Sequence, residues 1–506
     1  MSADPATGRP GKDLPANPNL EHLRKQAKAV LRSFQQQEPE AAARFRKLKL
    51  KVAPKLSDAQ RLIAHEYGFA SWAKLKKHVD AAAAAMNEAV KLVRKAFRDD
   101  DVEAFRRVLR QYPVLKTRIN EPVGDFGAPL INHVHSAAML DAMLEAGADI
   151  NARSHWEPGS FGLLDSAPPD VAAHAIQRGA IVTVHAAARL GMMEKLKELI
   201  GADPQLVHAR GGDGQTPLHF ASTVEVAEYL LAHGADMEAR DLDHESTPAQ
   251  YMLRERDEVA RYLVRRGCKT DILMAAALGE RELVEKHLQK DPESIRMRVS
   301  DEYFPIISPR TGGAIYQWKL GWYVSSVQVA KSFGHQAIFD LLMERSPVEE
   351  KLLNACWLHD EAMVKALLAQ HPNLAAALPP AGRRHVAHAA RNSDVIAARL
   401  MVAAGLPVNT FSQHHASALH WAAFHGQAEL AQLLIDYGAA LEDSDHDFKG
   451  TPLNWAMYGS QNAWDPELGN YPATVKVLLQ AGASLPRELG GTEAVKEVLR
   501  RHGMKR

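Results

Sequence analysis

The chain has 506 residues, with 61 Lys and Arg residues balanced by 61 Asp and Glu residues, so its formal net charge is zero. This balance argues against a strongly basic nucleic-acid-binding protein, and we find no apolar run long enough to span a bilayer. The two cysteines, Cys268 and Cys356, lack CxxC spacing and an obvious disulfide partner, so we expect a reducing, cytoplasmic setting.

The N-terminal part differs from the rest of the chain. Residues 1–16 contain proline and glycine but no apolar core, which predicts a flexible tail and not a signal peptide. Residues 17–80 predict a small basic helical domain, with helices near 20–34, 40–48, 57–67 and 75–79. Its 14 Lys and Arg residues outnumber six Asp and Glu residues. This face could bind an anionic partner, but the simpler explanation, which we favour, is that Lys and Arg solvate amphipathic helices.

Residues 81–87 begin with five alanines and predict a helical linker to the next part of the chain. Residues 410–443 then contain one complete helix-turn-helix unit. Ser417 stands at the N-cap of a helix expected over 418–424, and Gly426 ends it. A second helix is expected over 428–436, and Gly438 follows it where a positive φ costs little. Because one such unit cannot bury its own apolar face, neighbouring units must stack.

Related segments recur along the chain. TPLHFA stands at 216–221, LLAHGAD at 230–236 and GTPLNWA at 450–456. In the first of these, Thr216 is placed to cap a helix, Pro217 occupies its first turn, and His219 can hydrogen-bond back to the threonine. The glycines that close the second helices are 32 residues apart from Gly147 to Gly179 and 33 residues apart from Gly405 to Gly438.

These stretches closely resemble the ankyrin repeat family. NLEHLRKQAKAVLRSF and YGFASWAKLKKHV, in turn, resemble a small helical segment often found ahead of bacterial ankyrin repeats. The resemblance implies an all-α solenoid, which is a binding scaffold more often than an enzyme. We expect about twelve repeats over residues 88–485 and a capping helix within residues 486–506. Second helices end before Pro113, Pro204, Pro292 and Pro372, where we expect an extended exit.

Insertions interrupt the repeats, and insertions of this kind form loops where function is sought. Residues 298–324 carry β-branched and aromatic residues around Thr311-Gly312-Gly313, which predicts an inserted β-hairpin. Residues 459–471 lengthen the final glycine spacing, from Gly438 to Gly482, to 44 residues.

Candidate ligand-binding residues come from two sources. The insertions supply aromatic side chains that could stack on a ligand: Tyr316, Trp318, Trp322, Tyr323, Trp464 and Tyr471. For Trp318, Trp322 and Trp464, packing within the insertions is an equal alternative. The resemblance implies that residues just before each capping hydroxyl, and the last two of each first helix, face a concave groove: Asp243, His244, Arg254, Glu255, Phe333, Gln413, His414, Phe424, His425, Asp447, Phe448 and Tyr458. Trp421 and Trp455 follow the capping motif, where packing between helices is expected.

We therefore expect a scaffold that recognises a protein segment or a small ligand through this groove. The alternative is a hydrolase or lyase in which His414, His425, Asp447 or Glu255 transfers protons, although HExxH, GxSxG and phosphate-loop motifs are absent from the sequence. His385 and His388 share a helical face, which permits a metal ion, but we predict neither a metal site nor a cofactor.

Overall fold

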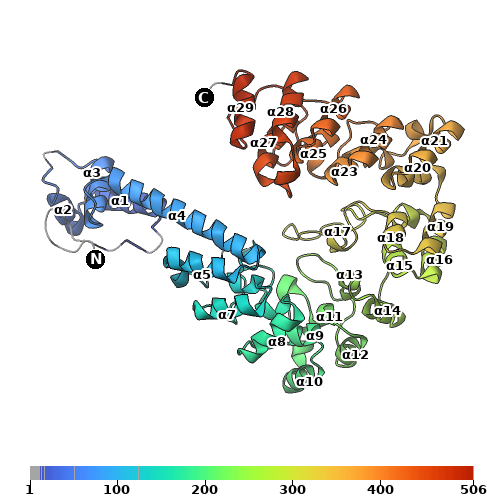
Figure 1. The fold of residues 1–506 in the computed structure, drawn as a ribbon, viewed down its shortest axis with the longest axis horizontal. Coiled ribbons are helices and arrows are strands. Elements are labelled where there is room, and N and C mark those ends of the chain that lie inside the picture. Colours follow the sequence, from blue (N-terminus) through green and yellow to red (C-terminus); the bar gives the residue numbers. More distant parts are fainter. Residues whose placement is uncertain (1–11, 13, 16–17, 51, 123–124, 505–506) are drawn as a thin grey trace. The chain divides into compact units, whose positions relative to one another are not determined.

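The computed structural model describes residues 12, 14–15, 18–50, 52–122 and 125–504. In this described part the regular structure is entirely helical, which confirms the all-α prediction. The chain divides into two compact units, residues 1–220 and 221–506, and most of their helices are labelled in Figure 1. Most of the predicted N-terminal tail lies outside the described residues.

The first unit begins with α1 (Leu20–Gln35), α2 (Pro39–Arg46), α3 (Leu56–Glu66) and the long α4 (Trp72–Arg98). The bounds of the first three helices lie within two residues of the predicted segments. The Oδ1 atom of Asn19 accepts a hydrogen bond from the N–H of Glu21 at 2.7 Å and so caps α1. Leu23, Phe45 and Leu62 belong to one apolar cluster that the four helices bury together.

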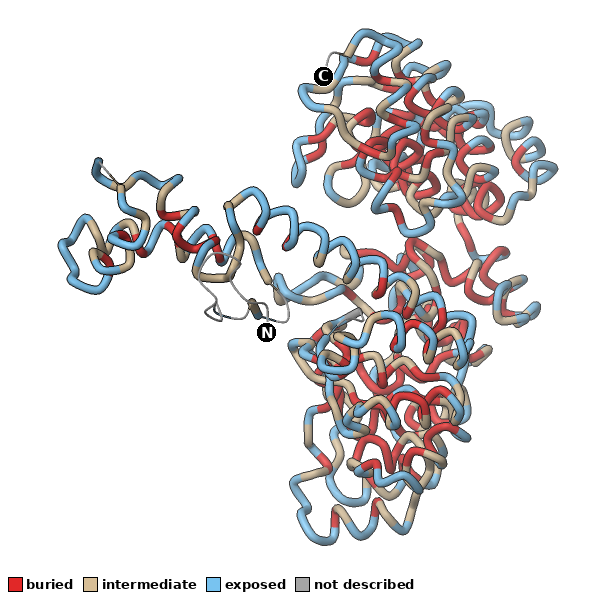
Figure 2. Tube along the Cα trace, turned by 60° about the vertical axis from the view of Figure 1, so that its left-hand side comes forward, coloured by how far each residue is buried: buried red, intermediate tan, exposed pale blue. Residues whose placement is uncertain are grey.

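Helix α4 contributes to two separate cores. Leu75 and Val79 pack in the N-terminal cluster, whereas Val93 and Phe97 pack in the core of the first repeats. Residues 80–88, between them, are exposed or half-buried (Figure 2). Alanine has the highest helix propensity, so this stretch stays helical with little packing. The predicted linker over 81–87 thus lies inside a continuous helix.

The rest of the first unit consists of shorter helices, of which α5 to α9 contribute to a second core. They are α5 (Val102–Gln111), α6 (Val114–Thr117), α7 (Ala137–Glu145), α8 (Pro169–Gln177), α9 (Val184–Arg189), α10 (Met193–Ala202) and α11 (Pro217–Phe220). Thr216 and His219 interact as predicted, because the N–H of Thr216 donates to Nδ1 of His219 at 3.1 Å.

The second unit continues the pattern of paired helices. It contains α12 (Val224–Ala232), α13 (Pro248–Met252), α14 (Asp257–Arg265), α15 (Ile272–Leu278), α16 (Arg281–Lys290), α17 (Tyr316–Lys319), α18 (Ser326–Ser332), α19 (Gln336–Arg345), α20 (Val348–Trp357), α21 (Glu361–Gln370), α22 (Leu374–Ala377), α23 (His385–Arg391), α24 (Val395–Ala403), α25 (Ala418–Phe424), α26 (Ala428–Asp436), α27 (Pro452–Asn462), α28 (Tyr471–Gln480) and α29 (Glu493–Arg501). From α20 onward the helices share one continuous apolar core.

Helices α25 and α26 have the predicted bounds. The N–H of Ser417 donates to Nδ1 of His420 at 3.2 Å, which leaves Nε2 of the same ring to donate to the carbonyl of Gly450 at 3.1 Å. One imidazole therefore caps its own helix and ties it to the following repeat. Gly426 and Gly438 have φ values of +67° and +83°, as their positions after the two helices require.

The extended exits predicted at the prolines are wrong. Asp203 and Asp291 are extended, with φ values of −143° and −147°, as the residue before proline should be. However, Pro204 and Pro292 then begin short 3-10 helices, η4 (Pro204–His208) and η6 (Pro292–Arg296). Proline favours the first turn of a helix because its missing N–H is not needed there.

The predicted hairpin over 298–324 is also wrong, because no strand is found in this fully described segment. Only its base is paired, through a bridge between Arg298 and Ser325. Further along, the N–H groups of Ile307 and Ser308 donate to the Glu245 carboxylate at 2.8 Å each. At Ile307 and Ser308 the backbone of the insertion therefore finds its hydrogen-bond partners on another repeat and not on a facing strand.

Among the helices that the structure describes, we find none with the length and hydrophobicity needed to cross a bilayer.

Candidate binding site in the C-terminal repeats

A hollow of about 650 Å³ lies beside α25 and α27 in the second unit. We call it the aromatic pocket. The described residues that line it are His414, Trp421, Phe424, Phe448, Lys449, Gly450, Asn454, Trp455, Tyr458, Asn462 and Trp464. Five of these were predicted as ligand-binding residues, from the turn tips, from the ends of first helices and from the second insertion: His414, Phe424, Phe448, Tyr458 and Trp464.

The floor of the pocket consists of three buried rings, Trp421, Phe424 and Trp455. The rings of Trp421 and Trp455 meet edge to face, with centroids 5.0 Å apart. The indole N–H of Trp421 donates to Oγ of Ser412 at 2.7 Å, and that of Trp455 donates to the Asp445 carboxylate at 2.9 Å. Because both N–H groups are satisfied internally, the floor is rigid and offers a ligand mainly ring surface.

The walls consist of three aromatic side chains that remain open to solvent. Phe448, Tyr458 and Trp464 are 69%, 61% and 57% exposed. Each is a large apolar ring beside an apolar floor, so a ligand that covered them would bury a substantial apolar area without first rearranging the pocket.

The second insertion is held against the C-terminal end of α25. The Tyr471 hydroxyl donates to the carbonyl of Phe424 at 2.9 Å, and the N–H of Asn470 donates to the carbonyl of Gly426 at 2.8 Å. A Cβ atom at Gly459 would lie 2.2 Å from the carbonyl oxygen of Phe424, so α27 approaches α25 only because this residue is glycine. These contacts fix Trp464 over the floor.

Arg391, at the end of α23, packs behind the pocket. Its guanidinium carbon lies 4.3 Å from the ring centroid of Trp322, 5.6 Å from that of Trp421 and 5.2 Å from that of Trp464. Its Nε donates to the side-chain oxygen of Gln413 at 2.9 Å. Burial lowers the pKa of Arg391 to about 10, which leaves it charged at neutral pH. One cation thus joins the two insertions to the repeat between them.

His414 and Asp447 form the most polar edge of the pocket. Nδ1 of His414 lies 2.6 Å from the Asp447 carboxylate. A carboxylate accepts hydrogen bonds, so Nδ1 is the donor in this contact and Nε2 is the ring nitrogen left for another partner. This is an arrangement in which a carboxylate orients an imidazole.

A comparison with protein-family models decides the family. The model for ankyrin repeats matches the chain in three copies, over residues 184–274, 327–445 and 386–488. The chain belongs to the ankyrin repeat family. The matched ranges leave out residues 275–326 and therefore the first insertion, whereas the second insertion lies within the last matched range. The aromatic pocket of this ankyrin array consequently combines ordinary repeat positions with inserted ones.

Two of the predicted binding residues are packed inside the ankyrin array. Trp322 and Tyr323 are only 6% and 5% exposed. The ring of Tyr323 stacks on His388 at 3.5 Å between centroids, and burial raises the pKa of Tyr323 to about 12. The indole N–H groups of Trp357 and Trp322 donate to Nδ1 of His385 and His388, at 2.9 and 3.4 Å. Each imidazole therefore carries its proton on Nε2, and neither is oriented as a metal ligand.

A second group of predicted residues holds the first insertion in place. Nδ1 of His244 donates to the carbonyl of Gly313 at 2.9 Å, and its ring lies 4.6 Å from that of Trp318. The N–H of Gly312 donates to the carbonyl of Asp243 at 2.8 Å. Tyr316 is fully buried and donates to the Asp271 carboxylate at 2.9 Å.

The remaining members of this group make similar contacts. The Arg254 guanidinium lies over the ring of Phe333 at 4.5 Å, and Glu255 forms an ion pair with Lys319 of α17. Neither Glu255 nor any other member of the group lines the aromatic pocket. The single groove expected from the sequence is therefore two regions, an anchorage for the first insertion and a pocket beside the second.

The predicted residues His425, Asp447 and Tyr471 contact residues of the pocket's lining, and Gln413 contacts Arg391 behind it. None of these four residues lines the pocket itself. Nε2 of His425 donates to the carbonyl of Arg391 at 3.0 Å, and burial lowers the pKa of the ring. His425 is thus a neutral structural donor.

Sequence reasoning missed several residues at this site. Trp421 and Trp455 were expected in the core, and they are buried there while also lining the pocket. Lys449, Asn454 and Asn462 were not singled out. Arg391 could have been found, because it stands at the end of a first helix, the position that selected Phe424 and His425.

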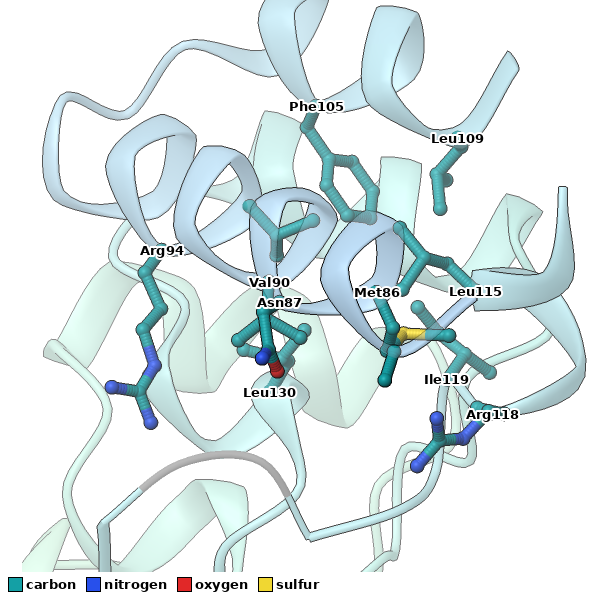
Figure 3. Close-up of a pocket in the computed structure, with 12 residues that line it drawn as sticks. Met86, Asn87, Val90, Arg94, Phe105, Leu109, Leu115, Arg118, Ile119 and Leu130 are labelled. Atoms are coloured by element: carbon teal, nitrogen blue, oxygen red, sulfur yellow. The ribbon is translucent and has the colours of Figure 1, made fainter. Parts of the chain in front are cut away.

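Another hollow, of about 270 Å³, lies in the first unit between α4, α5 and α6. Figure 3 shows that its lining is mainly apolar, with Arg94 and Arg118 on opposite sides. Arg118 is paired with Glu121, at 2.6 Å between Nε and the carboxylate. None of the residues predicted to bind a ligand lines this hollow.

Proposed function

We propose that this ankyrin array recognises a segment of a partner protein and that the aromatic pocket anchors it. The observation that carries the proposal is the convergence of three exposed rings, Phe448, Tyr458 and Trp464, over a buried aromatic floor. Aromatic side chains clustered in this way dominate the binding energy of protein interfaces. Exposed apolar groups that are not scattered but gathered at one hollow mark an interaction site.

Rigidity supports the same proposal. The floor rings make internal hydrogen bonds, and the second insertion is tied to the end of α25. A partner that binds to a preformed surface loses less conformational entropy of the receptor, so a few anchoring contacts can suffice.

The test compares two tryptophans of similar exposure. Peptides selected on the intact chain from a random display library are measured by fluorescence anisotropy against the Trp464→Ala and Trp318→Ala variants. Trp464 is 57% exposed in the pocket, and Trp318 is 59% exposed on the first insertion. We expect Trp464→Ala to weaken binding at least about tenfold, as for a central anchor, and Trp318→Ala to leave it unchanged. Peptides that depend on Trp318, or on neither residue, contradict the proposal.

The organisation of the whole chain is also part of this proposal. We propose a basic helical domain over 17–80, about twelve repeats over 88–485 and a capping role for the helix within 486–506. Helix α29 supports the last point, because Val495 and Leu499 are buried on one face while the other face is polar. We also propose a cytoplasmic protein of bacterial type. Cys268 and Cys356 are free, and burial raises the pKa of both thiols to about 12, which suits a reducing compartment.

A second candidate function rests on one observation, the short contact between His414 and Asp447 at the edge of the pocket. A carboxylate-oriented imidazole can act as a general base through Nε2. The other residues of the enzymatic hypothesis support it less, since Glu255 pairs with Lys319 and His425 donates to a backbone carbonyl. Turnover of an aromatic ester or amide that is lost in His414→Gln, but kept in His371→Gln, would favour this function.

A further inference from the structure

The charge of the aromatic pocket restricts what can occupy it. Its lining includes the cationic Lys449 and the imidazole of His414, while the described residues that line it include no carboxylate. Lys449 is exposed, and none of the ion pairs found in the described part of the chain involves it. Two acidic side chains contact the lining from outside it. Asp447 is bound to His414, and the buried Asp445 accepts hydrogen bonds from the indole of Trp455 and from the N–H groups of Phe448 and Gly450.

Two aromatic rings of the pocket already contact a cation, the guanidinium of Arg391. The Arg391 guanidinium lies over both Trp421 and Trp464. The attraction of an aromatic face for a cation is electrostatic, so a cationic ligand would meet repulsion from both Arg391 and Lys449 in a partly dry site. Because Asp445 and Asp447 are both bound to groups of the protein, the exposed ammonium of Lys449 favours a neutral or anionic occupant.

Hydrogen-bond donors in the pocket favour an anionic ligand over a neutral one. Asn454 stands in its repeat where His420 stands in the preceding one, and its side-chain oxygen accepts from the N–H and hydroxyl of Thr451 at 3.0 and 2.9 Å. The amide nitrogen is therefore left to donate elsewhere, whereas Nε2 of His420 donates to the carbonyl of Gly450. Asn454 and Lys449 thus present donors to a ligand, and carboxylates are the strongest acceptors that peptides supply.

We infer that the aromatic pocket takes an aromatic side chain from a peptide segment in which acidic residues flank that side chain. This inference rests on the proposed function and adds the chemistry of the partner. The ring lies against Trp421, Trp455 and Trp464, and a flanking carboxylate pairs with Lys449. A peptide suits the site better than a free aromatic acid, because the same insertion offers a second exposed apolar side chain, Leu468, which stands four residues after Trp464 and is 86% exposed.

The test uses the intact chain and three fluorinated tripeptide amides, N-acetyl-X-(4-fluorophenylalanine)-X-amide, where X is Asp, Ser or Lys. Dissociation constants come from the change in ¹⁹F linewidth. We expect the Asp peptide to bind about fivefold more tightly than the Ser peptide and the Lys peptide to bind more weakly than both. Raising the salt concentration should reduce the difference.

Two charge reversals identify the source of the preference. Lys449→Glu should abolish the preference for Asp, whereas Lys476→Glu, on the exposed side of α28, should preserve it. Free N-acetyl-4-fluorophenylalanine serves as the small-molecule comparison, and we expect it to bind more weakly than the Asp peptide.

The peptide measurements can overturn the inferred acidic preference without overturning the proposed function. Equal binding of all three peptides, lost in Trp464→Ala, would overturn the inference and keep the function. Tighter binding of the Lys peptide, or binding of the free acid as tight as that of the Asp peptide, would also overturn the inference. If no peptide shows binding that depends on Trp464, or if sedimentation shows that a second copy of the chain covers the pocket, both fail.

Discussion

Arg391 is the residue whose loss should most directly loosen the aromatic pocket. Its planar guanidinium packs against Trp322, Trp421 and Trp464 at once. Lysine keeps the charge but lacks the flat, delocalised group, so Arg391→Lys should lower the free energy of unfolding of the second unit by about 1–2 kcal/mol. Urea denaturation followed by tryptophan fluorescence measures the change. A loss below about 0.3 kcal/mol would show that the three contacts contribute little to stability.

Substitution of Gly459 and of Gly201 by alanine should change the stability of the protein in opposite directions. Both lie within helices, but a Cβ atom at Gly459 would lie 2.2 Å from the Phe424 carbonyl oxygen, whereas a Cβ atom at Gly201 would meet nothing within 4 Å. Gly459→Ala should therefore destabilise the protein by about 2 kcal/mol through overpacking. Gly201→Ala should stabilise it by about 0.5–1 kcal/mol, because alanine is the better helix former. Thermal denaturation of both variants checks the signs, and two losses of similar size would contradict the packing argument.

At the scale of the element, α4 has a middle stretch that lies between two cores and packs in neither of them. Residues 80–88 have no buried member, so their helix depends on the propensity of the alanine run. Ala84→Pro should cost about 3 kcal/mol locally and open the helix there, while Ala84→Gly should cost about 1 kcal/mol. Limited proteolysis should cut the proline variant within 80–88 and spare the original chain. Equal resistance of both would mean that the exposed stretch is held by contacts with other parts of the chain.

Elements governed by local rules could be predicted from the sequence, and those governed by distant partners could not. The bounds of α25 follow from Ser417 and Gly426, which act within one turn of the helix they begin or end. The insertion over 298–324 carried the composition of a hairpin, yet Glu245, which stands 62 residues before Ile307, supplies its acceptors. Only knowledge of which repeats lie side by side could have shown that Glu245 accepts these hydrogen bonds.

At the scale of the whole molecule, the concave positions implied by the resemblance were informative but did not form a single site. His414, Phe424, Phe448 and Tyr458 meet in the pocket, whereas His244, Arg254 and Glu255 hold the first insertion. Equivalent positions of different repeats therefore line the pocket in one repeat and hold an insertion in another. What distinguishes them is which insertion packs against the position and whether it leaves a hollow there, which depends on tertiary packing and not on the repeat pattern.

Histidines that are buried while neutral should make the whole molecule sensitive to mild acid. Burial, reinforced by nearby arginines, lowers the pKa of His385 and His388 well below the ordinary value. Burial also lowers the pKa of His185, His420 and His425. In the unfolded chain these rings take up protons near pH 6.5, while in the folded chain they do so only at lower pH. The unfolded state thus binds more protons below about pH 6.5, so the stability present above that pH is lost as the pH falls.

Substitution of His385 and His388, both in α23, tests whether these two rings cause the loss of stability in acid. At pH 5.5, one unit below the unfolded pKa, each buried ring contributes up to about 1.4 kcal/mol to the loss. His385→Gln combined with His388→Gln keeps acceptors for the indole N–H groups of Trp357 and Trp322 but removes the titration. The stability lost between pH 7.5 and 5.5 should therefore shrink by about 2–3 kcal/mol in the double variant, and it should not change in His371→Gln, whose side chain is exposed. Urea midpoints at the two pH values measure both effects, and an undiminished loss in the double variant would assign the acid sensitivity to other groups.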